Sequence, residues 1–370
     1  MALLEAPAHR WIILHALFSP RIAGAERYCV DLANHQAALG HRVHLAGQPG
    51  SPMQAALAAN VTFHAMASPW LRGFRMRRLM ERLNVDLCHA HLSPACKAVS
   101  RASTAVTNVA TLHVGYKSHQ HARFNGVICV NRAQSTRLNG YRGAARIIPN
   151  WLPSTETTCL SANATQSSVR LRTELGLKPR QRLIGAVGRL HPSKGVDVLI
   201  SAFKAMAPTA AALVIVGEGP QRAALERLAD GDTRIHFLGF RSDVPWLLQE
   251  LDLFVSPSRE ESFGLAILEA MRAGLPIISS ATEGPRDVFG GQPIEWVTPA
   301  SVTEMAAAMK RTLSSLSGQS ESRVAYDLSH FEASRAVTMV MDFYLQSARQ
   351  RQDSAFGFKP AVDAREPLIV

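Results

Sequence analysis

Short apolar runs alternate with amphipathic stretches along most of the chain, and this alternation constrains the fold more than any other feature. Runs of strand length, such as Trp11–Phe18 and Leu183–Val187, precede stretches with helical periodicity, such as Ala25–Leu39 and 196–206. Parallel strands need such crossover helices. The alternation occurs on both sides of a Ser- and Thr-rich stretch at 154–169. The pattern therefore predicts an α/β protein with two doubly wound parallel sheets.

The length of 370 residues suits two domains of ordinary size. We expect a first domain at 1–153, a linker at 154–170 and a second domain at 171–331. A helix at 332–352 is expected to cross back to the first domain, followed by a loose tail at 353–370. Two such domains facing across a cleft would place a ligand between their carboxyl edges, where doubly wound sheets bind ligands.

Positive charge is concentrated in the first half, where residues 1–150 contain 17 Lys and Arg but 5 Asp and Glu. This imbalance predicts an anionic partner, and a membrane surface, a phosphorylated acceptor and nucleic acid all fit charge alone. The five cysteines form no CxxC pair, which indicates free thiols in a reducing compartment. The chain has no apolar run of about 20 residues and its start lacks signal-peptide features, so we expect a cytoplasmic protein.

The segment Ser258–Ser280 contains two acids, Glu261 and Glu269, around an expected helix start near Gly264. Free N–H groups at a helix start favour an anion such as a diphosphate. Carboxylates accept paired hydrogen bonds from sugar or ribose hydroxyls. The segment predicts a ligand site, although each acid read alone also fits an ordinary helix residue.

The segment Gly185–Gly195 follows a predicted strand and contains Arg189 and Lys194 around a turn. Cations here would neutralise a departing diphosphate if no metal did so. A basic surface turn is the alternative. Asp230-Gly231-Asp232 is expected to be a solvated turn, and the first-half histidines lack the helical spacing of a zinc site. We therefore predict no essential metal.

The strings Gly188–Gly195, G-R-L-x3-K-G, and Glu261–Met271, E-S-F-G-L-x3-E-A-M, resemble the retaining family-4 glycosyltransferases. Ala23-Gly24-Ala25-Glu26 is similar to that family's Gly-Gly-x-Glu turn, with Ala23 in place of the first glycine. Pro149-Asn150 is similar to its interdomain turn. The resemblance implies the GT-B fold, with two Rossmann-like domains, and no cofactor.

The resemblance implies a role for each matching residue. Arg189 and Lys194 would hold the donor diphosphate, Glu261 would contact the transferred sugar, and Glu269 would bind the ribose. The backbone near Phe240 would border the base. His113 would be catalytic together with Arg189, Lys194 and Glu261. The remaining matches are His113 and the residues that would bind the substrate, namely Gly24, His91, Ser262, Phe263, Gly264 and Leu265. Among these, His113 would lie near the transferred sugar, and Ser262 stands where the family usually has glycine.

The segment Trp70–Leu83 is the strongest basic cluster. On a helix, Arg75, Arg78 and Arg82 share one face, and an adjoining face is apolar (Met76, Leu79, Met80 and Leu83). An anionic membrane contact through Arg72–Arg82 fits this pattern. The alternative is a solvated helix that packs its apolar stripe on the first domain. No recognised nucleic-acid motif is present, so nucleic acid is not expected.

These observations predict a metal-independent enzyme that moves a hexose from a nucleotide sugar, UDP-hexose by family frequency, with retention of configuration. The acceptor would be a glycan or a lipid-linked molecule in lipopolysaccharide or surface polysaccharide synthesis. The alternatives are a nucleotide-sugar 2-epimerase of the same architecture and a non-catalytic, membrane-associated GT-B partner. A dinucleotide dehydrogenase is disfavoured because no G-x-G-x-x-G opens either half.

Overall fold

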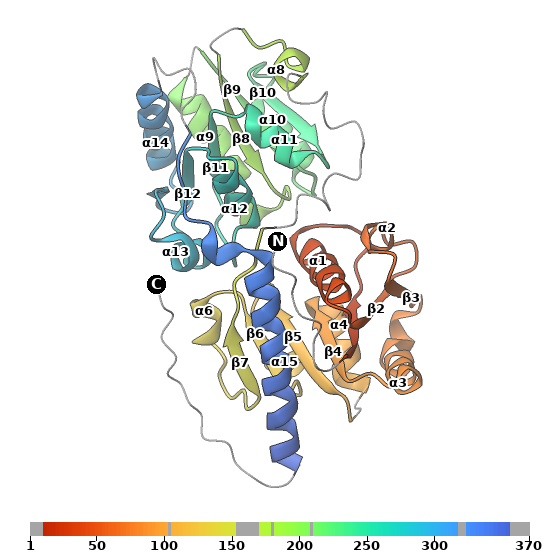
Figure 1. The fold of residues 1–370 in the computed structure, drawn as a ribbon. Helices are drawn as coiled ribbons and strands as arrows, with labels where there is room; N and C mark the ends of the chain where they lie inside the picture. Colours follow the sequence, from red (N-terminus) through yellow and green to blue (C-terminus); the bar gives the residue numbers. More distant parts are fainter. Residues whose placement is uncertain are drawn as a thin grey trace. The chain divides into compact units, whose positions relative to one another are not determined.

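The computed structural model describes residues 10–102, 105–152, 170–178, 181–207, 210–316 and 323–355. The chain divides into two compact units. The first runs to Ile148 and resumes at Ser334, and the second is Pro149–Ala333 (Figure 1). Most of the predicted linker, Cys159 and the chain beyond 355 lie outside the described residues.

The first unit is built on a seven-stranded sheet with the order β3-β2-β1-β4-β5-β6-β7. Every pair of neighbouring strands is parallel. The strands are β1 (Ile12–Leu17), β2 (Arg42–Gly47), β3 (Val61–Ala65), β4 (Leu87–His91), β5 (Thr107–Leu112), β6 (Gly126–Cys129) and β7 (Ala144–Ile147). The strand order reverses between β1 and β4, the point where such sheets bind ligands.

Helices connect these strands, and the last helix of the chain completes the unit. They are α1 (Gly24–Ala38), α2 (Met53–Ala56), α3 (Arg72–Leu83), α4 (Leu92–Ala102), α5 (Ser118–His121), α6 (Arg132–Ser135) and α15 (Ala333–Ala355). Helix α15 lies along the first sheet beside β6 (Figure 1). The approach is so close that a Cβ on Gly126 would lie 2.4 Å from Ser347 Oγ. The helix also extends to Ala355, past the expected start of the tail at 353.

The second unit repeats the design with a six-stranded parallel sheet of order β10-β9-β8-β11-β12-β13. Its strands are β8 (Arg182–Val187), β9 (Ala211–Val216), β10 (Ile235–Gly239), β11 (Leu253–Ser256), β12 (Ile277–Ser280) and β13 (Glu295–Val297). Its helices are α8 (Arg170–Glu174), α9 (Val196–Met206), α10 (Arg222–Ala229), α11 (Val244–Glu250), α12 (Leu265–Arg272), α13 (Glu283–Phe289) and α14 (Val302–Ser315). The predicted fold class, two doubly wound parallel sheets, is confirmed.

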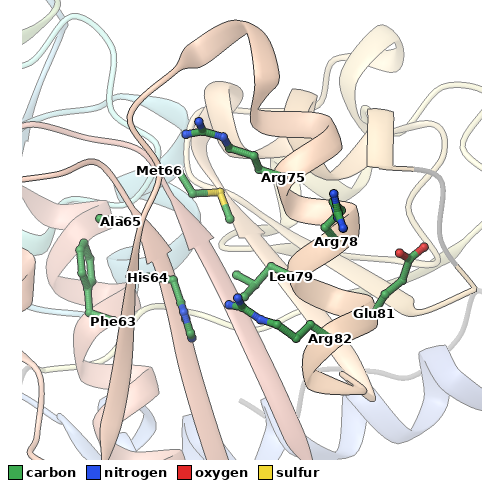
Figure 2. A pocket seen from close by; sticks show the side chains of 9 residues that line it. All are labelled: Phe63, His64, Ala65, Met66, Arg75, Arg78, Leu79, Glu81 and Arg82. Carbon is green, nitrogen blue, oxygen red and sulfur yellow. The ribbon is translucent and has the colours of Figure 1, made fainter.

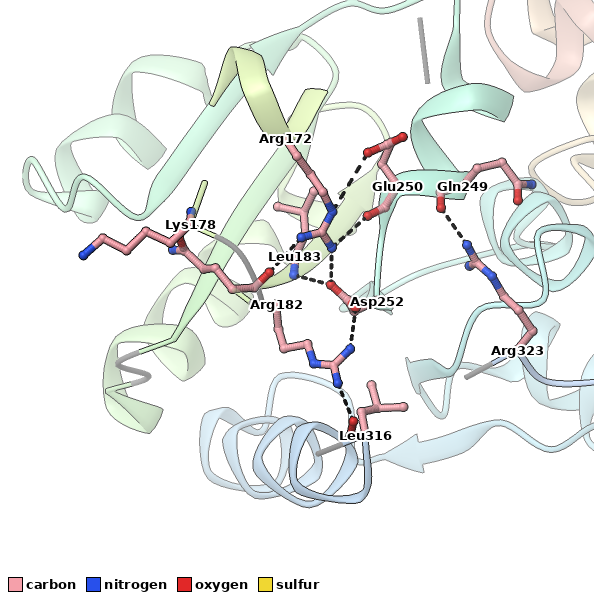
Figure 3. Close-up of polar contacts among 10 residues, drawn as sticks. Arg172, Lys178, Arg182, Leu183, Gln249, Glu250, Asp252, Leu316 and Arg323 are labelled. Atoms are coloured by element: carbon pink, nitrogen blue, oxygen red, sulfur yellow. Dashed lines mark hydrogen bonds and ion pairs between the residues drawn. The ribbon is translucent and has the colours of Figure 1, made fainter. Parts of the chain in front are cut away.

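An aspartate at the amino edge ties the central strands of each sheet together. Asp252, just before β11, accepts hydrogen bonds from Arg172 Nη2 at 2.6 Å and Leu183 N at 2.7 Å (Figure 3). It also pairs with Arg182 Nη1 at 2.7 Å. Asp86, just before β4, accepts a bond from Ile12 N at 2.7 Å in the same way. Charged hydrogen bonds of this kind are about twice as strong as neutral ones, so they stabilise the edge opposite the ligand-binding one.

The hydrophobic pattern did not predict α4. The helix begins directly after β4, with Leu92 at φ 63° and Pro94 in its first turn. Proline is tolerated there because the first N–H groups of a helix have no intrahelical partner.

No helix in the described part of the chain is long and apolar enough to cross a membrane.

Candidate functional site

Lys194 and Glu261 form an ion pair at the carboxyl edge of the second sheet. Lys194 ends a short 3-10 turn after β8, and Glu261 lies in the loop between β11 and α12. Their side chains are 23% and 17% exposed, and the free carboxylate oxygen of Glu261 accepts a bond from Ser262 N at 3.1 Å. The ammonium group has three donors, so this pair leaves Lys194 able to bind another anion.

A second, bidentate ion pair locks the same two loops together. Arg259 donates to Asp197 through Nη1 at 2.7 Å and Nη2 at 2.6 Å. Its backbone N–H also donates to Ser193 O at 2.8 Å. This pairing holds the pKa of Asp197 below its usual value, since a bidentate hydrogen bond favours the carboxylate. Sequence reasoning did not identify this clamp, because its two members are 62 residues apart.

Close backbone packing fixes the loops that carry Lys194 and Glu261. Gly195 has φ 61°, and a Cβ there would lie 2.1 Å from Pro257 O. A Cβ on Gly284, in α13, would lie 2.4 Å from Ser262 O. Gly264 has φ 98° and caps α12, whose first N–H groups lack intrahelical partners. Side chains at these positions would displace the loops, so glycine is required on steric grounds.

Phe263 and Glu269 are buried, whereas two other predicted residues are exposed. The Phe263 ring packs edge-on against Phe289, with centroids 5.4 Å apart, and this contact anchors the loop between β11 and α12 in the core of the second unit. Glu269 lies inside α12 with 8% exposure, and Leu265 is half-buried at its start. Arg189 and Phe240 have exposed side chains after β8 and β10. Neither forms a hydrogen bond or ion pair with Lys194 or Glu261 among the described residues.

In the first unit, Gly24 opens α1, and the predicted histidines lie at strand ends. Glu26 Oε2 accepts a bond from Ala23 N at 3.0 Å and so caps that helix. His91 ends β4 and lies 3.2 Å from His113, which follows β5 (Nδ1 to Nε2). His91 is fully buried and His113 is half-buried. The structure therefore brings together the two histidines that the sequence singled out.

His15, which sequence reasoning did not select, continues this cluster inward. Its Nδ1 lies 3.1 Å from His91 Nε2, and its Nε2 lies 2.7 Å from Gln36 Oε1. Ligand atoms of His15, Cys29 and His91 lie within 4.8 Å of one another. Histidines three or four residues apart on a helix are not needed for such a grouping. Here β1 and β4, which are neighbours in the sheet, bring the imidazoles together.

Burial keeps these imidazoles neutral. Desolvation lowers the pKa of His15 to about 4 and that of His113 to about 3, and holds the pKa of His91 well below its usual value. His89, the register partner of His15 on β4, is affected in the same way. At neutral pH each ring therefore carries one proton and offers one donor and one acceptor.

The apolar face of α3 packs on the first unit, which is the alternative interpretation of this segment. Met76, Leu79 and Met80 are buried in the first-unit core, so this stripe cannot insert into lipid. The arginine face is free: Arg75, Arg78 and Arg82 lie on one flank of α3, beside Met66 and His64 (Figure 2). They line a groove of about 800 Å³. Exposed apolar side chains lie just before and within the helix, at Trp70, Leu71 and Phe74.

Comparison with known families identifies both units. Residues 22–155 match the family model described as Glycosyltransferase Family 4, and residues 181–315 match the model described as Glycosyl transferases group 1. The chain is a family-4 glycosyltransferase. The lipopolysaccharide core biosynthesis mannosyltransferase LpsB of Rhizobium meliloti is 26% identical to this glycosyltransferase over 278 residues, covering 71% of this chain and 75% of LpsB. The 2-deoxystreptamine glucosyltransferase of Streptomyces kanamyceticus is 27% identical over 302 residues, covering 79% and 72%.

Solved structures of other glycosyltransferases share the GT-B fold. HepE from Anabaena, in complex with UDP-glucose, has a TM-score of 0.70 and 22% identity, covering 94% of this chain and 100% of that one. A glycosyltransferase from Rickettsia africae has a TM-score of 0.69 and 16% identity, covering 94% and 97%. The predicted GT-B architecture is therefore confirmed for this glycosyltransferase.

The buried histidines predict that this glycosyltransferase loses stability in mild acid. An unfolded histidine binds a proton below about pH 6.5, whereas folded His15 does so near pH 4. The unfolded state thus binds more protons between these values, and the free energy of unfolding falls as the pH falls through this window. His15 alone accounts for a loss of about 2 kcal/mol between pH 7 and pH 5.

Urea unfolding at pH 7 and pH 5 tests this expectation. The wild type should lose several kcal/mol between the two values, and His15→Gln should lose about 2 kcal/mol less. An identical loss in both proteins would show that His15 is not a neutral, buried group in the folded state.

Proposed function

We propose that this glycosyltransferase moves a hexose from a nucleotide sugar, UDP-hexose, to a glycan or lipid-linked acceptor with retention of configuration. The observation that carries the proposal is the Lys194–Glu261 pair, held by the Arg259–Asp197 clamp at the carboxyl edge of the second sheet. That edge is where doubly wound sheets bind nucleotides. The UDP-glucose bound to HepE and the lipopolysaccharide role in the name of LpsB support the choice of donor and acceptor.

Cleavage of the donor leaves negative charge on the diphosphate, and positive groups must stabilise it. Lys194 and Arg189 provide two cations, and the capped start of α12 at Gly264 provides backbone N–H groups. These groups supply the charge stabilisation, so no step of the proposal uses a metal. Glu261 keeps Lys194 in place and accepts hydrogen bonds from sugar hydroxyls.

For the remaining donor contacts, we propose the roles that the family resemblance implies. Glu269, buried in α12, binds the ribose hydroxyls, and the backbone beside Phe240 borders the base. Ser262, Phe263 and Leu265 carry the backbone that faces the sugar. In the first unit, the amides near Gly24 contact the diphosphate, and His113, which is hydrogen-bonded to the buried His91, supports the transferred sugar. The departing diphosphate itself accepts the proton of the acceptor hydroxyl.

Substitution of either member of the ion pair tests this assignment. Lys194→Ala and Glu261→Ala should each lower the rate of sugar transfer at least ~100-fold, the scale of losing one positioned electrostatic group. The matched control is Lys204→Ala, since Lys204 lies on α9 and contacts Leu228 O and Asp230 instead. Near-normal transfer by either site variant would reject the assigned role. To distinguish transfer from 2-epimerisation, the nucleotide sugar is incubated with the enzyme without acceptor. An epimerase would convert the sugar to its 2-epimer under these conditions, and a transferase would not.

We further propose that the first unit binds anionic membranes beside α3. Trp70 is 93% exposed and Phe74 is 60% exposed, and the guanidinium of Arg78, which lines the groove, lies 5.6 Å from the centroid of the Phe74 ring. Aromatic side chains favour the membrane interface, and arginines attract anionic lipid. This arrangement would bring a lipid-linked acceptor to the enzyme.

Vesicle sedimentation tests the membrane proposal. The protein should sediment with vesicles of phosphatidylglycerol at low salt and be released at high salt, since screening weakens exposed charges. Trp70→Ser combined with Phe74→Ser should weaken sedimentation, whereas Leu345→Ser, an exposed apolar residue on α15, should not. Equal sedimentation with neutral vesicles would contradict the proposal.

A further inference from the structure

A chain of hydrogen bonds in the first unit connects α15 to His113. Tyr344 of α15 contacts Gln36 of α1, with Gln36 Nε2 at 3.3 Å from the hydroxyl. Gln36 contacts His15, His15 contacts His91, and His91 contacts His113. Tyr344, Gln36, His15 and His91 are all fully buried. The mechanism proposed above gives no role to the first three of these residues.

The orientation of the Gln36 amide sets the direction of the chain. Gln36 Nε2 lies 3.5 Å from Met341 Sδ as well as near the Tyr344 hydroxyl. A thioether sulfur can accept a hydrogen bond but has no proton to donate, so the amide nitrogen, not the oxygen, must face it. Gln36 Oε1 therefore faces His15 Nε2, at 2.7 Å, and accepts from it.

The direction of the Gln36–His15 hydrogen bond determines the direction of the hydrogen bonds between the neutral imidazoles that follow. His15 donates through Nε2, so its Nδ1 must accept from His91 Nε2. His91 Nδ1 must then accept from His113 Nε2. Each step follows because a neutral imidazole has one N–H donor and one acceptor. His113 is thereby left with an unprotonated Nδ1, which has no hydrogen-bond partner among the residues that the structure describes.

The other branch of the network agrees with this direction. The Tyr344 hydroxyl accepts from Gln36, and its own proton then has His89 Nδ1, at 2.7 Å, as its acceptor among the described residues. His89 then donates from Nε2 to Thr111 Oγ1 at 2.8 Å. Each interior member, namely Tyr344, His89, His15 and His91, receives one hydrogen bond and gives one, so none of them has to reverse its direction. Such a fully satisfied buried network favours a single arrangement of protons.

A metal ion is the rival explanation for the grouping of His15, Cys29 and His91. Both ring nitrogens of His15 and of His91 already have partners at hydrogen-bond distance. Burial also raises the pKa of the Cys29 thiol well above its usual value, which opposes the thiolate that metals require. The described contacts therefore favour hydrogen bonding over metal ligation.

We propose that Tyr344, acting through Gln36, His15 and His91, fixes His113 in the Nε2–H form, so that its Nδ1 presents a hydrogen-bond acceptor at the carboxyl edge of the first sheet. We expect a sugar hydroxyl to donate a hydrogen bond to His113 Nδ1, and this expectation rests on the proposed sugar transfer. Tyr344, Gln36 and His15 are positioning residues, since they act on the substrate through His113. Orienting groups of this kind fix the tautomer of catalytic histidines elsewhere.

Histidine ¹⁵N NMR of the full-length protein tests the proposal directly. His113→Gln identifies the His113 signals among the 14 histidines. In the wild type, Nε2 should have the shift of a protonated nitrogen and Nδ1 that of an unprotonated one. In Tyr344→Phe, Gln36 Nε2 keeps only the weak sulfur acceptor of Met341, so the amide is held less firmly and the two His113 shifts should move toward each other as both tautomers become populated. Gln36→Met, which removes both amide groups, should have the same effect.

The control is Tyr326→Phe, which removes a half-buried tyrosine hydroxyl that is hydrogen-bonded to Leu275 O at 2.7 Å in the second unit. It should leave the His113 shifts unchanged. An unchanged His113 tautomer in both Tyr344→Phe and Gln36→Met would overturn the proposal. Stoichiometric zinc in the purified protein would overturn it as well.

Transfer assays separate this inference from the proposed function. If the wild type transfers sugar, Tyr344→Phe should lower kcat about two- to tenfold at unchanged KM for the donor, because only part of the population then has the competent tautomer. If the wild type transfers none, the proposed function fails, while the NMR result still decides the tautomer of His113.

Discussion

The clamp between Arg259 and Asp197 is the interaction on which the site in the second unit depends. It joins the loops after β8 and β11, two neighbouring strands, and holds Lys194 opposite Glu261. Without this bond, the backbone hydrogen bonds from Arg259 N and Glu260 N to Ser193 O would still join the two segments, but no side-chain clamp would hold Lys194 opposite Glu261. A bidentate pair between arginine and carboxylate has fixed geometry as well as strength, so it determines where the neighbouring charges lie.

In both units, the polar groups that stabilise the sheet and the polar groups that could bind a ligand lie at opposite ends of the strands. Asp86 and Asp252 stabilise the amino edges through hydrogen bonds from the backbone N–H groups of Ile12 and Leu183. The polar groups available to ligands, Lys194, Glu261 and His113, lie in segments that follow strands at the carboxyl edges. The parallel arrangement makes this division general, since all strands of a sheet end at one edge. Polar residues at the two ends of the strands therefore have different roles.

Helices and strands with a regular hydrophobic pattern could be predicted from the sequence. Contacts that depend on which strands are neighbours in the sheet could not. Strands such as β8 and helices such as α9 follow directly from hydrophobic periodicity. Lys194 and Glu261 were each selected from their positions between a strand and a helix, whereas the ion pair between them, 67 residues apart, was not predicted. The contact between His15 and His91 depends on strand neighbours that are far apart in the sequence. The face of α3 that becomes buried was also undecided, because amphipathic helices pack on proteins and on lipid with the same pattern.

The central claim is that the second unit binds a nucleoside diphosphate through Lys194, and calorimetric titration tests it most directly. We expect UDP, or another nucleoside diphosphate from a panel with GDP and ADP, to bind the wild type. Lys194→Met should weaken that binding by about tenfold or more, the value of one charged hydrogen bond, and Lys204→Met should leave it unchanged. The account would be contradicted if no nucleoside diphosphate bound, or if Lys194→Met bound it as tightly as the wild type.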